Sequence, residues 1–122
     1  MHKDRDFSLY ISIINYDKYV RKYIASNIPA VHRDLKIHLL DENYSLKRNL
    51  LEAQYNKGNI RVKYIVELIV TISMLDIILS DISELCPLSK KHVNVAIEQL
   101  TRIKNMTYAW RKNPEPNEKT NN

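Results

Sequence analysis

The stretch of residues 60–82, IRVKYIVELIVTISMLDIILSDI, constrains the fold of this chain more than any other. It contains neither Pro nor Gly, and at about 100° per residue its apolar side chains fall on almost every side of a helix. A helix that is apolar nearly all round is either buried in a core or spans a membrane. Glu67, Asp76 and Asp81 interrupt the run too often for a span, which needs roughly 20 mostly uncharged residues. We therefore expect the central helix of a helical protein without a membrane segment, in which only a narrow strip through Lys63, Glu67 and Asp81 meets water.

Composition narrows the class of protein further. At 122 residues the chain is long enough for one domain with its own core, and one Gly with four Pro argues against turn-rich β folds. Cys86 is the single cysteine, no CxxC motif occurs and no secretory h-region opens the chain, so we expect a reduced, cytoplasmic setting. The histidines lack metal-ligand spacing and no Gly-rich phosphate loop exists, so we expect no metal or cofactor.

Two helices are predicted before the central one. The first covers residues 7–26, after a frayed MHKDRD, and its core seam consists of Leu9, Ile13, Tyr16, Val20 and Tyr23. It should end by Ile28, because the residue before a proline is disfavoured in the α region, and Pro29 suits the first turn of the next helix. The second helix covers residues 29–57, with a core face formed by Val31, Leu35, Leu39, Leu46, Leu50 and Ala53.

The remaining boundaries follow from turn and cap residues. Gly58 suits a left-handed position after the second helix, and Asn59 can cap the third. Cys86-Pro87-Leu88 is a break, and Ser89 is a suitable N-cap for a fourth helix that Trp110 closes. Short breaks between helices of similar length predict an all-α, up-down-up-down antiparallel four-helix bundle over residues 1–112. Residues 113–122, with two prolines and no apolar side chain, are predicted to be a disordered tail.

The first two helices each carry a second apolar stripe, which a helix at the corner of a monomeric bundle does not need. On the second helix this stripe lies about 175° from the core face. Exposed stripes of this kind usually mark interfaces, so we expect self-association. The candidate oligomer interface comprises Phe7, Ile11, Ile14, Ile37, Leu40, Tyr44 and Leu51.

Basic residues lie beside these stripes and on the fourth helix, within a net charge of +5. They favour an anionic partner such as RNA, or an RNA–DNA hybrid, bound through phosphates with little sequence preference. The candidate surface for nucleic acid or a protein partner comprises Lys18, Arg21, Lys22, Arg33, Lys36, Lys47, Arg48, Lys90, Lys91, Arg102, Arg111 and Lys112. Asp76 shares its angular position with Ile65 and Ile72, so we expect an Arg or Tyr partner for it from a neighbouring helix.

One spacing points to catalysis. Arg33 and His38 have the Arg-four-His spacing of HEPN ribonucleases, which are also small helical bundles, and such a pair could polarise a phosphate and move a proton. Residues five apart on a helix point in directions about 140° apart, so the two converge only at a dimer groove or a kink. We therefore expect no catalytic residue and no enzymatic activity, and keep the ribonuclease as an alternative.

The order of the landmarks resembles one family, the four-helix-bundle accessory variability determinants of diversity-generating retroelements, which are related to proteins encoded in ribosomal-RNA intervening sequences. The resemblance covers residues 6–112 and depends on order and spacing, because each motif is weak alone. The matching landmarks are YVRKY at 19–23, Ile28-Pro29, LLEA at 50–53, the long apolar third helix, and residues 103–112 with Trp110. The family typically has small residues before that tryptophan, where this chain has Thr107-Tyr108-Ala109.

The resemblance implies a fold, partners and a role. It implies a pentameric barrel of bundles that binds the reverse transcriptase of the retroelement and its template RNA or cDNA. Such a protein supports mutagenic reverse transcription without being catalytic. A structural helical oligomer of another role is a further alternative, because the residues alone indicate apolar stripes and positive charge but no reverse transcriptase.

Overall fold

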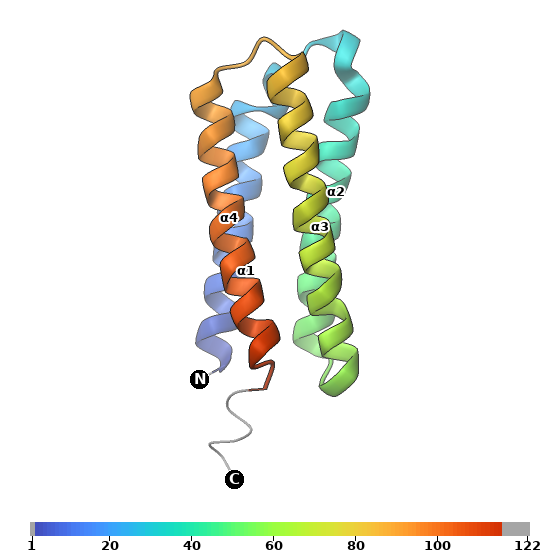
Figure 1. Ribbon diagram of the computed structural model, residues 1–122, viewed down its shortest axis with the longest axis vertical. Coiled ribbons are helices and arrows are strands. Elements are labelled where there is room, and N and C mark those ends of the chain that lie inside the picture. Colours follow the sequence, from blue (N-terminus) through green and yellow to red (C-terminus); the bar gives the residue numbers. More distant parts are fainter. Residues whose placement is uncertain (1, 116–122) are drawn as a thin grey trace.

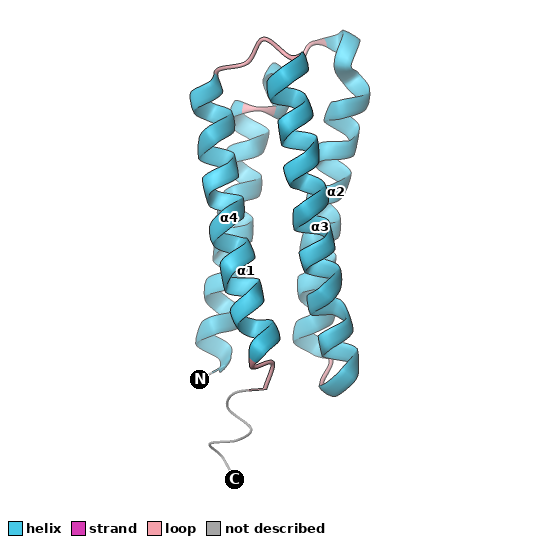
Figure 2. Ribbon diagram, viewed as in Figure 1, coloured by secondary structure: helices cyan, strands magenta, loops and turns pink. Residues whose placement is uncertain are grey.

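Four antiparallel α-helices form a bundle (Figure 1). The computed structural model describes residues 2–115, with side chains from residue 8 onward. The helices are α1 (His2–Tyr23), α2 (Arg33–Tyr55), α3 (Gly58–Leu85) and α4 (Lys90–Lys112). Figure 2 shows that short loops join them, and no strand occurs in residues 2–115. The predicted four-helix bundle is confirmed.

The core is built by the seams that the sequence predicts on α1 and α2. Leu9, Ile13, Tyr16 and Val20 of α1 are buried, whereas Tyr23 is half-buried. They meet Leu39, Leu46, Leu50 and Ala53 of α2, together with buried residues of α3 and α4. The closest packing joins α2 to α3, α1 packs against α4, and α1 and α2 contact each other less. The seam between α1 and α2 is therefore the more open side of the bundle.

The strip of α3 predicted to meet water is confirmed, since Lys63, Glu67 and Asp81 are exposed, but it also carries apolar residues that were not expected there. Val70, Met74 and Ile77 are 57%, 44% and 55% exposed, on the same side of α3 as Lys63, Glu67 and Asp81. The opposite side carries the buried Ile65, Leu68, Ile72, Leu75 and Leu79. The charged residues marked the side that faces water, but periodicity alone does not show how many apolar residues share that side. No helix in the described part of the chain is long and apolar enough to cross a membrane.

The connection between α1 and α2 also differs from the prediction. The helix α1 begins at His2, so the frayed lead-in is not observed, and it ends at Tyr23. Two 3₁₀ turns follow, η1 (Ala25–Asn27) and η2 (Ala30–His32), and α2 begins only at Arg33. Pro29 has an extended ψ of 152° and precedes η2 instead of opening α2. Val31 is consequently 81% exposed and not part of the core.

Of the predicted turn and cap residues, Gly58 and Ser89 are confirmed in position, whereas Asn59 is wrong as a cap. Gly58 has a left-handed φ of 61°, as expected. The helix α3 starts at Gly58, however, so Asn59 is not its cap. The Gly58 N–H donates instead to Oε1 of Glu115 at 2.6 Å, and a carboxylate at a helix N-terminus is stabilising. Ser89 occupies the N-cap position of α4, but its hydroxyl bonds to no N–H of the helix.

The end of the bundle where α2 meets α3 is closed by Arg61 and Trp110. Both are buried, and the Arg61 guanidinium lies 5.7 Å from the centre of the Trp110 ring. Nη1 of Arg61 and Nε1 of Trp110 both donate to the Pro114 carbonyl, at 3.0 and 3.2 Å. The first three residues of the predicted tail thus reach this end through Pro114 and Glu115. Residues 116–122 lie outside the described part of the chain.

Candidate functional site

The fold gathers several of the predicted basic residues at one end of the bundle. At this end α1 finishes and α2 and α4 begin (Figure 1). Lys22 lies in the last turn of α1, and Lys90 and Lys91 open α4; all three are exposed. Arg33 and Lys36 in the first turns of α2 belong to the same end. Lys18 is exposed one turn before Lys22.

Other predicted basic residues are not brought to that end. Arg102 lies on the second half of α4, and Arg111 and Lys112 lie in its last turn, at the opposite end of the bundle. Cations in the last turn of a helix interact favourably with its dipole, so Arg111 and Lys112 already have a structural role. Arg48, halfway along α2, lies 3.9 Å from Glu52 in a long, exposed ion pair.

Arg21 and Lys47 are bound to a carboxylate that the sequence analysis did not single out. Asp17 is buried between α1 and α2. Its Oδ2 accepts hydrogen bonds from Arg21 Nε at 3.0 Å and Lys47 Nζ at 2.7 Å, and its Oδ1 accepts one from Asn43 Nδ2 at 3.0 Å. The ring of Tyr44 covers both cations, at 5.1 Å from the Arg21 guanidinium and 5.2 Å from Lys47 Nζ. We call Asp17, Arg21, Asn43, Tyr44 and Lys47 the Asp17 cluster.

The electrostatics of the Asp17 cluster indicate a structural role. Burial alone would raise the pKa of the Asp17 carboxyl, but the hydrogen bonds and charges of Lys47 and Arg21 outweigh it and lower the pKa below its usual range. The hydrogen bond to Asp17 is the largest cause that raises the pKa of Arg21. Two cations share one carboxylate, so the cluster keeps part of its positive charge, but Arg21 and Lys47 are not free for phosphate.

Aromatic rings also gather at the basic end, joining α1 to α4. The rings of Tyr19 and Tyr23 are 4.7 Å apart between centroids, and His92 lies 4.7 Å from Tyr23 and 6.3 Å from Tyr19. Lys22 Nζ lies 5.2 Å from the centre of the Tyr23 ring. All three rings are half-buried. Only the folded bundle brings His92 to the two tyrosines, because it lies on α4 and they lie on α1.

The pair with catalytic spacing is not assembled within one chain. Arg33 and His38 are both exposed on α2. Five residues apart on an α-helix they point about 140° from each other, and no hydrogen bond or ion pair joins them. Within residues 2–115, no group of three or more His, Cys, Asp or Glu side chains is arranged to hold a metal ion.

The expected partner of Asp76 is not observed. Asp76 is half-buried and makes no hydrogen bond or ion pair to another residue in the described part of the chain. Burial is the main cause that raises the pKa of Tyr16. The charges of Asp17 and of the nearby Asp76 raise it further. The Tyr16 hydroxyl is buried without a hydrogen-bond partner among the described residues. Half-burial leaves Asp76 access to water, which explains how it stays without an Arg or Tyr.

The predicted oligomer stripes lie outside the core. Ile11, Ile37, Tyr44 and Leu51 are exposed, and Ile14 and Leu40 are half-buried. Phe7 lies outside the described side chains. Two grooves include members of the stripe on α2 beside basic residues. One is lined by Ile28, Pro29, Ala30, Arg33, Lys36, Ile37 and Leu40, and the other by Tyr10, Ile13, Ile14, Lys47, Leu50 and Leu51.

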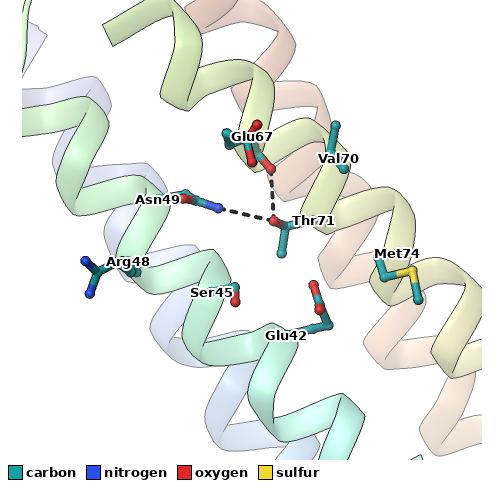
Figure 3. A pocket seen from close by; sticks show the side chains of 8 residues that line it. All are labelled: Glu42, Ser45, Arg48, Asn49, Glu67, Val70, Thr71 and Met74. Atoms are coloured by element: carbon teal, nitrogen blue, oxygen red, sulfur yellow. Dashed lines mark hydrogen bonds between the residues drawn. The ribbon is translucent and has the colours of Figure 1, made fainter. Parts of the chain in front are cut away.

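A third groove runs between α2 and α3 (Figure 3). Its floor is held by Asn49, which donates to Thr71 Oγ1 at 3.2 Å, while the Thr71 hydroxyl donates to the Glu67 carbonyl at 2.9 Å. Val70 and Met74 form an apolar wall on α3, and polar residues of α2 face them. The groove therefore borders the exposed side of α3, which carries the apolar residues Val70 and Met74.

Parts of these sites could have been found from the sequence. Asp17 and Arg21 are four residues apart, a spacing at which opposite charges meet on a helix. Nothing in the sequence pairs Asp17 with Asn43 or Lys47, because that contact depends on how α1 and α2 pack. The same holds for Arg61, whose four carbonyl partners come from two separate segments, residues 53–56 and Pro114.

Comparisons of the chain with family models, with curated proteins and with solved structures gave no match. The likeness to the accessory variability determinants therefore depends on the order of the sequence landmarks alone.

Proposed function

We propose that this protein is a non-catalytic, nucleic-acid-binding accessory protein that acts as a homo-oligomer and supports mutagenic reverse transcription in a diversity-generating retroelement. The observation that carries the nucleic-acid part is the group of exposed lysines at one end of the bundle. Lys18, Lys22, Lys90 and Lys91 form no ion pair with a carboxylate that the structure describes. Unpaired cations grouped at one end suit a phosphate backbone.

Two features support the assembly and the partner. The apolar stripes on α1 and α2 remain outside the core, as expected of surfaces that meet another protein. A closed pentamer would repeat the four lysines around one ring and hold a backbone at several points. The resemblance in landmark order is what proposes the reverse transcriptase, template RNA and cDNA as partners.

The direct test is a titration of labelled single-stranded RNA and of an RNA–DNA hybrid with the protein. We expect binding to both at low salt, with a log–log salt slope of about −0.7 to −0.9 per phosphate neutralised. Replacing Lys18, Lys22, Lys90 and Lys91 with Gln should lower the affinity for both at least tenfold. The matched control replaces Arg102, Lys104, Arg111 and Lys112 with Gln, which removes the same charge from the other half of α4 and should change affinity much less.

Three outcomes would contradict the proposal. If neither RNA nor the hybrid binds at low salt, nucleic acid is excluded as the ligand. Equal losses of affinity in the two variants would show that net charge, and not the lysines at this end of the bundle, determines binding. Metal-free cleavage of the RNA that disappears in both Arg33→Ala and His38→Ala would favour the HEPN ribonuclease. The partner is tested by co-purification with a reverse transcriptase encoded beside the gene, and by the misincorporation rate of its cDNA with and without this protein.

A further inference from the structure

The exposed stripe of α3 lacks a partner within the bundle. Val70, Met74 and Ile77 follow each other at helical spacing, and each exposes about half of its surface. Acidic residues continue the same side toward the end of the helix, where Asp81 and Glu84 are exposed. Counted from the C-terminal end of α3, which leads into α4, this side therefore carries two carboxylates first and then three apolar side chains.

The outer side of α2 carries the complementary order over the same length of the bundle. The helix α2 starts at the end of the molecule where α3 finishes (Figure 1). Arg33 and Lys36 come first, followed by the apolar Ile37, Leu40 and Tyr44. The groove that contains Arg33, Lys36, Ile37 and Leu40 has no carboxylate among its lining residues. Cations on α2 thus lie level with the carboxylates on α3, and apolar residues lie level with apolar residues.

We propose that the outer side of α2 in one copy binds the outer side of α3 in a second copy, with the two bundles parallel. This inference rests on the proposed self-association and names the two surfaces that make it. In parallel copies each residue keeps its level along the bundle, so Arg33 and Lys36 meet Asp81 and Glu84 of the next copy. Ile37, Leu40 and Tyr44 then cover Val70, Met74 and Ile77.

This arrangement decides the symmetry of the assembly. The two surfaces belong to different helices, so the contact is head-to-tail, and a pair of copies keeps one free surface of each kind. Such contacts repeat until a ring closes, or continue as a filament. A two-fold dimer with parallel bundles, in which the same patch meets itself at the same level, would instead place like charges of Arg33 and Lys36 together, which is unfavourable.

The test measures mass by light scattering at micromolar concentration and low salt. Ile77→Glu should reduce the oligomer to the 14.4 kDa chain while the circular dichroism keeps its helical signal. The matched control is Tyr108→Glu, an exposed apolar position on α4 outside both surfaces, which should keep the parental mass. A charge reversal gives a second, independent readout. Arg33→Glu with Lys36→Glu should weaken the oligomer, as should Asp81→Lys with Glu84→Lys, and the four changes combined should restore it.

The outcomes separate this inference from the proposal on which it rests. A wild-type protein that is monomeric overturns the self-association itself. The α2–α3 contact is overturned, but not the self-association, if the wild type is an oligomer and Ile77→Glu leaves its mass unchanged. The same conclusion follows if the two charge reversals fail to compensate each other. If Ile77→Glu loses its helical signal, the charge reversals decide alone.

Discussion

Arg61 shows how a charged side chain is accommodated inside this bundle. Its Nε donates to the carbonyls of Ala53 and Asn56, both at 2.8 Å, and Nη2 donates to Gln54 at 3.2 Å. The last carbonyls of a helix lack partners within it, and the dipole makes that end attractive to a cation. Arg61 therefore caps the C-terminus of α2 from the first turn of α3 and also holds Pro114.

Arg61→Ala should destabilise the protein by about 2–4 kcal/mol, because several buried carbonyls lose a charged donor at once. Arg61→Lys should recover only part of this, since an ammonium cannot reproduce the planar fork of donors. Urea unfolding at one fixed protein concentration measures both effects. Arg102→Ala, an exposed arginine on α4, should stay within about 0.5 kcal/mol of wild type. An Arg61→Ala variant as stable as that control would show that water replaces the guanidinium without cost.

Asp17 should make stability depend on pH in a defined direction. Its pKa is lower in the folded protein than in the unfolded chain, so its stabilising contribution is fully present above the unfolded value of about 3.9. That contribution is lost as the pH falls toward the folded pKa. Asp17→Asn should cost about 1–3 kcal/mol at pH 7, and the difference from wild type should shrink below about pH 4. Unfolding free energies of both proteins between pH 3 and 7 measure it, and a difference independent of pH would exclude the ionised carboxylate as its source.

At the scale of the helix, the two ends of α4 carry like charges with opposite consequences. Lys90 and Lys91 lie at the positive end of the helix dipole, whereas Arg111 and Lys112 lie at the negative end. The first pair is therefore unfavourable for folding, which suggests that it is kept for binding an anion.

Replacing Lys90 and Lys91 with Gln should raise stability by about 0.5–1 kcal/mol and lower the affinity for RNA. The matched change of Arg111 and Lys112 to Gln should lower stability by a similar amount and leave RNA binding nearly unchanged. Urea unfolding and an RNA titration on the same samples give both readouts. If the two pairs shift stability in the same direction, the dipole does not explain their placement.

Periodicity predicted each helix and the core faces of α1 and α2, because a seam such as Leu9, Ile13, Tyr16 and Val20 has only one buried side. It predicted the outer side of α3 through Lys63, Glu67 and Asp81. It did not predict that Val70 and Ile77 share this side, because they look as suited to a core as Ile65 and Leu75. It also placed Val31 in α2, because a 3₁₀ turn after a proline has the same local composition as a helix start. The basic candidates were found by residue type, but their partners were not. Lys47, for example, is bound to Asp17, which lies 30 residues away in the sequence, whereas Lys22 meets no carboxylate among the described residues.

At the scale of the whole molecule, affinity for RNA should depend on assembly more than on the cations of one copy. The proposed ring would repeat Lys18, Lys22, Lys90 and Lys91 around its circumference, so one RNA strand could neutralise several groups together. Linked contacts bind far more tightly than single ones. The Ile77→Glu variant keeps every cation and should bind RNA at least tenfold more weakly, with a shallower salt slope, because each monomer neutralises fewer phosphates. Mobility-shift titrations at several salt concentrations, with Tyr108→Glu as the control, measure both quantities. A monomeric variant that keeps the affinity and slope of the wild type would show that each bundle binds RNA alone and that assembly is not needed for it.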